Sequence, residues 1–147
     1  MPSNYQRTYG LTTDNSAAIT INTGAHLGQP LILSLAGAQT VTLPAASGSG
    51  NSYTIMGSAD ATGDHIIQVA NASDTMMGIA MLGNDAAGMS CFYTADTSDT
   101  ITLNGSTKGG YKGWRVTLTD IVANVWQVEI VSEASGTEAT PFSAAVS

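Results

Sequence analysis

The sequence predicts an all-β protein: an antiparallel, jelly-roll-like β-sandwich of about ten short strands with extended terminal arms. Three observations lead to this fold class. Apolar and polar residues alternate in run after run, Gly, Asn and Asp separate the runs, and no stretch keeps a helical apolar period over three turns. A chain of 147 residues suits one domain, which at this length buries a sizeable core without a metal or a disulfide.

Each predicted strand is a short run whose apolar residues stand two positions apart and therefore share one face. Ile19 and Ile21 form the first such pair, and the glycines and asparagines between runs supply the positive φ values that tight turns require. The ten predicted strands, in order, are AAITIN (17–22), PLILSL (30–35), QTVTL (39–43), SYTIM (52–56), HIIQVA (65–70), TMMGIAML (75–82), MSCFYT (89–94), DTITL (99–103), GWRVTLT (113–119) and VWQVEIV (125–131).

The run at 75–82 differs from the others because it is apolar on both faces. This pattern predicts either a central strand or a strand at a subunit interface. Its three methionines, Met76, Met77 and Met81, suit both roles, since Met fills irregular contacts in cores and in interfaces alike. Both interpretations stay open.

The last two runs predict a hairpin that carries both tryptophans. If the strands pair, Leu118 lies near Trp126 and Trp114 lies towards Ile130, and aromatic and β-branched pairs of this kind stabilise a sheet by about 0.2–1 kcal/mol each. We expect the two Trp side chains to anchor the core, with a carbohydrate-stacking platform as the functional alternative. In the connection TDIVAN, Asp120 and Asn124 are able to close the turn with their side chains.

The two ends of the chain differ from its middle and predict three segments: an N-terminal arm at 1–16, a sandwich at 17–132 and a C-terminal arm at 133–147. Neither arm has a periodic apolar face, yet each carries isolated aromatic residues. Large rings bury much area at low entropy cost, which suits anchors that order on binding. We therefore expect Tyr5, Arg7 and Tyr9 at one end, and Phe142 at the other, to contact a neighbouring protein.

Composition excludes several classes of function. The net charge of −7 argues against nucleic-acid binding, although Lys108, Lys112 and Arg115 form a small basic island that we expect to be a solvated loop. No run reaches the ~18 apolar residues of a membrane span, and MPSNYQRTYG does not resemble a signal peptide. The single cysteine, Cys91, excludes an intrachain disulfide, fits assembly in a reducing cytoplasm and is expected to be buried.

The sequence contains no recognisable constellation of catalytic or metal-binding residues. Asp60 and Asp64 flank a Thr-Gly step that resembles a weak Ca²⁺ loop, but a hairpin tip is the favoured interpretation because ligands and a terminal Glu are missing. His26 and His65 have no partner at metal spacing, and no GxSxG motif occurs. We therefore expect no enzymatic activity, no metal and no cofactor.

The stretch VTLPAASGSGNSYTI (41–55) resembles a pattern frequent in virion proteins of tailed bacteriophages: an alternating strand, a TLPAA step, a Gly/Ser turn and a strand with an aromatic. In these proteins a polar strand, a Gly-containing turn and a Trp-bearing last strand often follow. Here those parts are similar to HIIQVANASDTMMG, DTITLNGSTKGG and NVWQVEIV. The resemblance runs from about Leu31 to Val131. The family that it points to includes fibre and spike segments as well as capsid decoration, or cement, proteins.

The resemblance implies a non-enzymatic cement protein that binds the capsid surface and stabilises the head. Its partner would be the major capsid protein, and it would assemble in the host cytoplasm and reside on the virion. We expect a homo-oligomer, with a trimer favoured because fibre-like relatives are commonly trimeric, and with Met76, Met77 and Met81 at capsid or subunit contacts. The alternative is a trimeric fibre, spike or head-fibre protein for host attachment.

Overall fold

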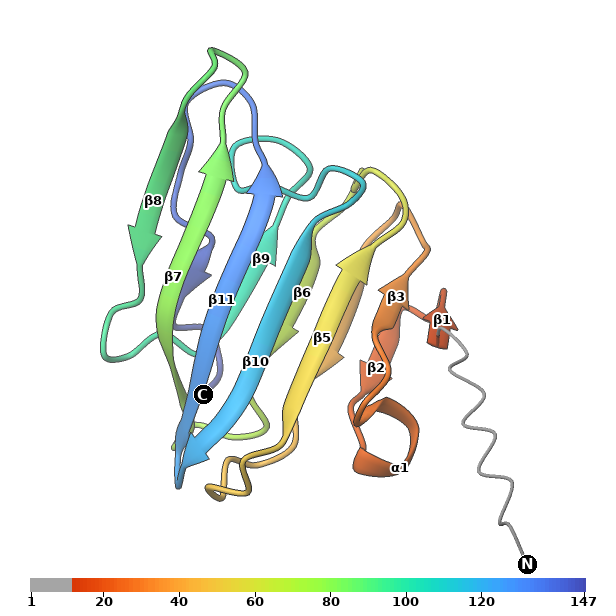
Figure 1. The fold of residues 1–147 in the computed structure, drawn as a ribbon, viewed down its shortest axis with the longest axis vertical. Coiled ribbons are helices and arrows are strands. Elements are labelled where there is room, and N and C mark those ends of the chain that lie inside the picture. Colours follow the sequence, from red (N-terminus) through yellow and green to blue (C-terminus); the bar gives the residue numbers. More distant parts are fainter. Residues whose placement is uncertain (1–11) are drawn as a thin grey trace, which may run out of the picture.

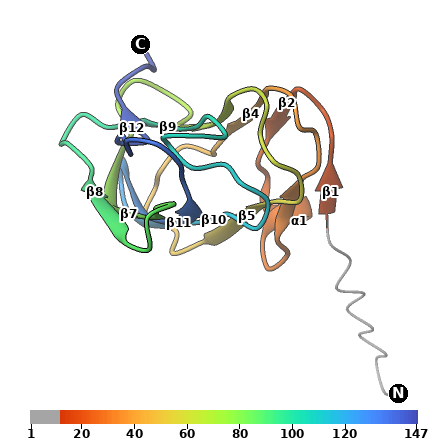
Figure 2. The same ribbon diagram turned by 90° about the horizontal axis from the view of Figure 1, so that it is seen from above.

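A computed structural model describes residues 12–147 and shows an almost wholly β architecture. Two sheets lie face to face, and their inner faces enclose the core (Figures 1 and 2). The seven-stranded sheet has the order β1 (Thr12–Asp14), β3 (Leu31–Leu33), β5 (Ser52–Gly57), β10 (Arg115–Val122), β11 (Val125–Glu133), β7 (Thr75–Gly83) and β8 (Met89–Tyr93). The five-stranded sheet has the order β12 (Phe142–Ser143), β9 (Thr100–Leu103), β6 (His65–Gln68), β4 (Gln39–Thr42) and β2 (Ala18–Thr20).

All ten predicted strands are present, and the single helix of the described chain is one turn, α1 (Thr23–His26). Asn22 caps this turn by accepting a hydrogen bond of 2.9 Å from the backbone N–H of Ala25. The strand prediction is confirmed because period-two alternation reports the buried face directly. In β4 and β6, for example, residues at every second position are buried.

The chain passes back and forth between the two sheets in its first half. Strands β1, β3 and β5 are parallel neighbours in the larger sheet, and β2, β4 and β6 are parallel neighbours in the smaller one. Parallel neighbours need a crossover connection, and here each crossover contains a strand of the opposite sheet instead of a helix. The first half of the chain therefore winds as a coil that adds one strand to each sheet in turn.

The second half is joined to this coil by antiparallel pairing. The β10–β11 hairpin lies between β5 and β7, with β10 antiparallel to β5 and β11 parallel to β7. Both sheets are therefore mixed, and the expectation of a purely antiparallel sandwich is wrong for the ladders of the first half and for β11–β7. Alternation along a strand does not distinguish the two pairing modes, because it depends only on which face is buried.

The predicted arms include strands of the fold. Within 1–16, β1 pairs with β3, and within 133–147, β12 pairs with β9 and buries Phe142. Residues 1–11, and with them Tyr5, Arg7 and Tyr9, lie outside the described residues. The boundaries predicted at 16/17 and 132/133 therefore do not coincide with the edges of the sheets.

The core lies between the sheets and contains both tryptophans, each 1% exposed. The Trp126 ring packs against Tyr53 at a centroid distance of 6.0 Å, and Trp114 lies edge-on to His65 at the same distance. Burying side chains of this size stabilises the fold by about 1.5–3 kcal/mol each. The expectation that both Trp anchor the core is confirmed. The inward aliphatic residues around them include Leu31, Leu33, Val41, Leu43, Ile55, Ile67, Ile101, Leu103, Val116, Leu118, Val128 and Ile130.

The β10–β11 hairpin has a register two residues away from the predicted one. Leu118 lies opposite Val128, and Trp126 lies opposite Asp120. The reason is that β10 continues through Val122, with an irregularity between Asp120 and Val122, so that the turn is shorter than the predicted TDIVAN loop. Asn124 makes this turn with a positive φ of 66°, a conformation that Asn tolerates better than most residues.

Candidate interaction surface

The outer face of the larger sheet carries a cluster of apolar side chains over β7, β8 and β11, which we call the outer patch. It consists of Met77, Ile79, Met81, Met89, Cys91, Tyr93 and Val131. The strand registers place these residues side by side: Ile79 opposite Tyr93, Met81 opposite Cys91, and Val131 beside Met81. Tyr93 is 75% exposed, Met89 65%, and Met77 and Val131 40% each.

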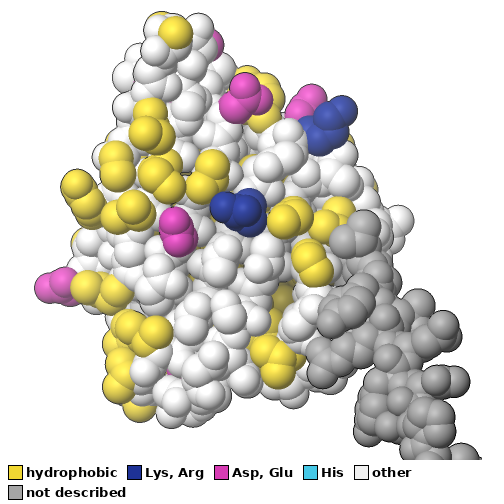
Figure 3. All heavy atoms as spheres, in the orientation of Figure 1, with side chains coloured by type: hydrophobic (Ala, Val, Ile, Leu, Met, Phe, Trp, Pro, Cys, Tyr) yellow, Lys and Arg dark blue, Asp and Glu magenta, His cyan; other side chains and the backbone are white. Residues whose placement is uncertain are grey.

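Hydrophobic side chains gather over this side of the sheet in Figure 3, and few charges interrupt them. The register places Glu129 beside Ile79 and Arg115 beside Val131, so that one carboxylate and one guanidinium border the patch. Contiguous exposed apolar residues with a polar border mark interaction sites, whereas apolar residues scattered singly over a surface do not. The outer patch is therefore the candidate interaction surface.

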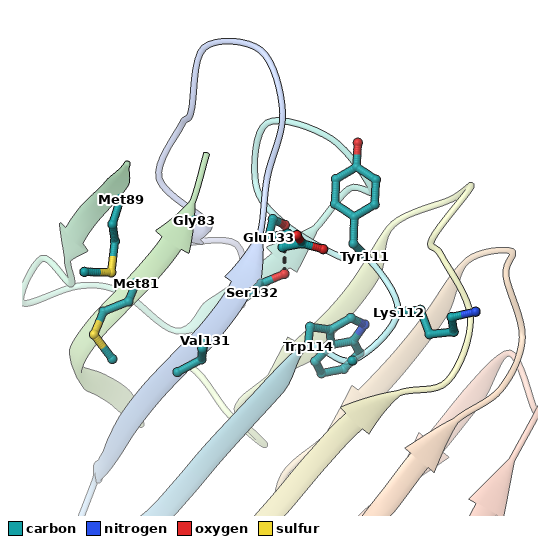
Figure 4. Close-up of a pocket in the computed structure, with 10 residues that line it drawn as sticks. Met81, Gly83, Met89, Tyr111, Lys112, Trp114, Val131, Ser132 and Glu133 are labelled. Atoms are coloured by element: carbon teal, nitrogen blue, oxygen red, sulfur yellow. Dashed lines mark hydrogen bonds between the residues drawn. The ribbon is translucent and has the colours of Figure 1, made fainter. Parts of the chain in front are cut away.

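A hollow of about 390 Å³ adjoins the outer patch near the ends of β7 and β11. Met81 and Met89 lie on one side of it, Val131 between, and Tyr111 and Lys112 on the other side (Figure 4). The Ser132 hydroxyl donates to the carbonyl oxygen of Glu133 at 3.0 Å, and the Tyr111 hydroxyl lies 2.8 Å from the Ser135 hydroxyl. The hollow extends the apolar surface and adds a polar rim.

The opposite end of the sandwich is held together by buried carboxylates. Asp120 lies in β10 and accepts the backbone N–H groups of Ser47, Gly48 and Ser49 at 2.7–3.1 Å. It also accepts the hydroxyls of Ser47 and Ser49, at 3.2 and 2.6 Å. Burial raises the pKa of Asp120. The hydrogen bonds from Ser49, Gly48 and Ser47 together lower it by more than burial raises it, so the pKa lies well below the usual value.

Two more buried acids act in the same way. Asp74 accepts the N–H of Ala46 at 2.9 Å, so the loop before β5 is bound at two successive points, by Asp74 and by Asp120. Asp99 accepts the hydroxyl of Thr100 at 2.7 Å and the N–H of Ala145 at 2.8 Å, which fixes the end of the chain. Because these carboxylates are committed to backbone donors, their role is structural.

The two histidines are structural as well. His65 is fully buried, and its Nε2 lies 2.9 and 3.1 Å from the carbonyl oxygens of Leu35 and Gly37. Nε2 is therefore the protonated nitrogen, since carbonyls only accept. The Nδ1 of His26 accepts the backbone N–H of Asn22 at 3.0 Å. Within residues 12–147, no group of three His, Cys, Asp or Glu side chains is arranged to hold a metal ion.

The structure separates the residues predicted to make contacts. Met76 is 0% exposed and belongs to the core, so its prediction as a capsid or subunit contact is wrong for the folded protomer. Met77 and Met81 lie in the outer patch on the opposite face of β7. One face of β7 therefore belongs to the core, and the interface alternative for the other, outward face stays a prediction. Phe142 is 7% exposed and packs into the core, which removes it as an arm anchor.

The structure also places two further residues, Cys91 and Asp60, that the sequence analysis considered. Cys91 is exposed on β8, so the prediction of a buried cysteine is wrong. Alternation alone placed it on a face with Met89 and Tyr93 but left the identity of that face undetermined. Asp60 accepts the backbone N–H of Lys112 at 2.7 Å, and this hydrogen bond ties the basic loop to the segment between β5 and β6.

The sequence reasoning missed Ile79, Met89, Tyr93 and Val131 as surface residues. The run at 75–82 is apolar on both faces and gave no signal for them; the structure shows that the core residues Met76, Ala80 and Leu82 of β7 have even numbers, so the odd-numbered apolar residues lie on the outer face. The strand register then carries that face to β8 and β11.

Comparison with known proteins gives no relative for this arrangement. No family model, no curated protein and no solved structure matches the chain. Among the described helices, none is long and apolar enough to cross a membrane.

Proposed function

We propose that the protein is a non-enzymatic structural protein of a tailed-bacteriophage virion, a decoration protein that binds the capsid surface and stabilises the head. The observation that carries the proposal is the outer patch, a contiguous apolar surface on the larger sheet. Four of its residues are at least 40% exposed. In this proposal the major capsid protein covers the patch, and neither a metal nor a cofactor takes part.

The chemistry of the outer patch suits a protein partner. Met and aromatic residues are enriched at the cores of interfaces, whereas charged residues are depleted there because they lose hydration on binding. Met77, Met81 and Met89 adapt to an uneven surface, and Tyr93 offers a rigid ring with a polar tip. Only 10% of the whole chain is charged, which keeps the desolvation cost of a large contact low.

The framework behind the patch is well suited to a cement role. Asp74, Asp99 and Asp120 bind loops that are distant in the sequence, and β12 ties the C-terminal segment into the smaller sheet. A surface held on a stiff support loses little conformational entropy when it binds. The stiffness of this framework supports the proposal that the protein reinforces the capsid shell.

A trimeric fibre, spike or head-fibre protein for host attachment remains the second candidate. The hollow beside the outer patch favours it, because Tyr111 and Lys112 on its rim are groups that recognise sugars or anionic surfaces. The homotrimer itself stays a prediction of the sequence analysis.

The number of copies in a virion tests the proposal and distinguishes the two candidates. Quantitative mass spectrometry of purified virions of the encoding phage, with the major capsid protein as internal standard, should give tens to hundreds of copies per particle. A copy number of about a dozen or fewer would favour the fibre or spike. Absence from the virion would overturn both candidates.

The contact role of Tyr5, Arg7 and Tyr9 belongs to the same proposal, and a truncation tests it separately. A chain lacking residues 2–10 retains every described strand, so its melting temperature should stay unchanged. Its affinity for capsids should fall at least tenfold, because two aromatic anchors and a charge are lost. Equal occupancy of capsids by the truncated and the full-length chain would restrict the contact to the sheet surface.

A further inference from the structure

Among the strands of residues 12–147, β8 ends the larger sheet, with one neighbour, β7, and one open edge (Figure 1). Natural proteins protect such edges with lysines, prolines, bulges or covering loops, because the unpaired backbone groups otherwise bind another strand. The sequence of β8, MSCFY, contains none of these residues, and its ladder with β7 is regular over all five positions.

The hydrogen bonds at both ends of the β7–β8 ladder show which residues face this edge. The N–H of Thr94 donates to Gly78, and the N–H of Asn84 donates to Gly88. In an antiparallel pair, hydrogen-bonded positions alternate with positions whose groups point away. Even-numbered residues of β8 therefore bond to β7. The N–H and C=O groups of Met89, Cys91 and Tyr93 point to the open edge.

The same three residues carry the exposed side chains of β8, which makes this edge self-complementary. When a second β8 strand pairs antiparallel with Cys91 opposite Cys91 of the second copy, Met89 lies opposite Tyr93 at both ends. All outward backbone groups of both strands are then paired. The nearest other registers that keep outward-facing groups opposite each other differ by two residues, and each leaves Met89 or Tyr93 without a partner in β8.

We propose that the β8 edge binds the β8 edge of a second copy of this chain, in an antiparallel pair centred on Cys91. The two larger sheets then form one continuous sheet, and the two outer patches lie on the same side of it because the two-fold axis is perpendicular to the sheet. Methionine sulfur beside the Tyr ring adds a favourable cross-strand contact at each end. This pairing does not depend on capsid binding, and it competes with the trimer favoured by the sequence.

Light scattering of the 147-residue chain at micromolar concentration tests the proposal. We expect a mass of about 30 kDa, twice the 15.0 kDa of the chain. Cys91→Lys places two like charges directly opposite each other and should give a monomer. Thr20→Lys, an exposed position on the edge strand β2, is the matched control and should leave the mass unchanged. A monomeric wild-type chain would overturn the proposal and leave the edge to a strand of another protein.

A cross-linking experiment tests the register itself. Hydrogen-bonded antiparallel residues have Cα atoms about 5.5 Å apart, within the range that a disulfide spans. Diamide, which takes up the two hydrogens of two thiols, should therefore link Cys91 to its counterpart in dilute protein. In the double variant C91S/Y93C the two new thiols lie four residues apart along the pair, about 13 Å, and should not cross-link. Equal cross-linking of both proteins, or a trimer unaffected by Cys91→Lys, would contradict the pairing.

Discussion

The hydroxyl of Ser49 donates a hydrogen bond of 2.6 Å to the carboxylate of Asp120, although 71 positions separate the two residues in the chain. This contact explains the uncharged turn SGSG between β4 and β5. Its small residues allow three consecutive backbone N–H groups and two hydroxyls to surround one carboxylate, an arrangement that binds anions well. The turn therefore has a structural role, and the charged group that it binds is the Asp120 carboxylate of β10.

Replacing Asp120 by Asn should lower the free energy of unfolding by about 2–4 kcal/mol, because the amide offers one acceptor atom where the carboxylate offers two. The amide NH₂ group would also face backbone N–H donors. Urea denaturation measures the change. Asp96→Asn, at an exposed position, is the control and should change stability by less than about 0.5 kcal/mol. Equal effects of the two substitutions would show that the contact contributes nothing specific.

The stability that Asp120 contributes should depend on pH with a definite sign. Its folded pKa lies below the unfolded value of 3.8, so the contribution is fully present above about pH 5 and is lost as the pH falls below about 4. The difference in melting temperature between wild type and Asp120→Asn should therefore narrow from pH 5 to pH 2. A difference that stays constant over this range would mean that Asp120 does not titrate as described.

Gly57 should not tolerate a side chain, because a Cβ atom there would collide with the indole nitrogen of Trp114. We expect Gly57→Ala to destabilise the protein by about 1–3 kcal/mol through overpacking. Gly83 is the matched control, since it also ends a strand but has open space around its Cα, with the nearest atom 3.9 Å from an added Cβ. Thermal melting measures both variants, and a melting temperature lowered equally in Gly57→Ala and Gly83→Ala would contradict the overpacking against Trp114.

Met76 and Met77 are neighbours in β7 but should respond oppositely to the same change. Met76→Asp buries a carboxylate in the core and should unfold the domain, whereas Met77→Asp, at a position 40% exposed, should leave it folded. Circular dichroism at 25 °C distinguishes the outcomes. A folded Met76→Asp variant would contradict the assignment of this face to the core.

Phe142 should behave as a core residue despite its place near the C-terminus. Phe142→Ala should cost about 3 kcal/mol, the range of aromatic truncations in packed cores, whereas Ser143→Ala on the exposed face of β12 should cost almost nothing. Denaturant titration measures both. An unchanged midpoint for Phe142→Ala would restore the prediction of a detached arm.

The sequence predicted the strands but not their arrangement, for a physical reason. Alternation such as that of Val41 and Leu43 reports a buried face locally, and it placed all ten strands. Parallel pairing of β4 with β6, or the position of β10 between β5 and β7, depends on contacts between distant segments that leave no local pattern. The weak β1 and β12 strands were missed because two or three residues show no period.

The candidate surface was predicted in part. Met77 and Met81 were selected from the run at 75–82, but separating them from Met76 required knowing which parity faces the core. Asp120 was expected to close its own turn, because Asp commonly does so. Its partners lie 71–73 positions away, a distance at which sequence reasoning about single turns has no information.

Binding of purified protein to capsids that lack it tests the central claim, that the outer patch is the docking surface. The double variant Met77→Lys/Val131→Lys adds two charges to the patch away from the β8 edge. The control Thr20→Lys/Ser143→Lys adds two charges to exposed positions of the smaller sheet. With all proteins folded by their melting temperatures, co-sedimentation should show wild-type occupancy for the control and at least a tenfold lower affinity for the patch variant. Equal occupancy of capsids by the patch variant and the wild type would contradict the account.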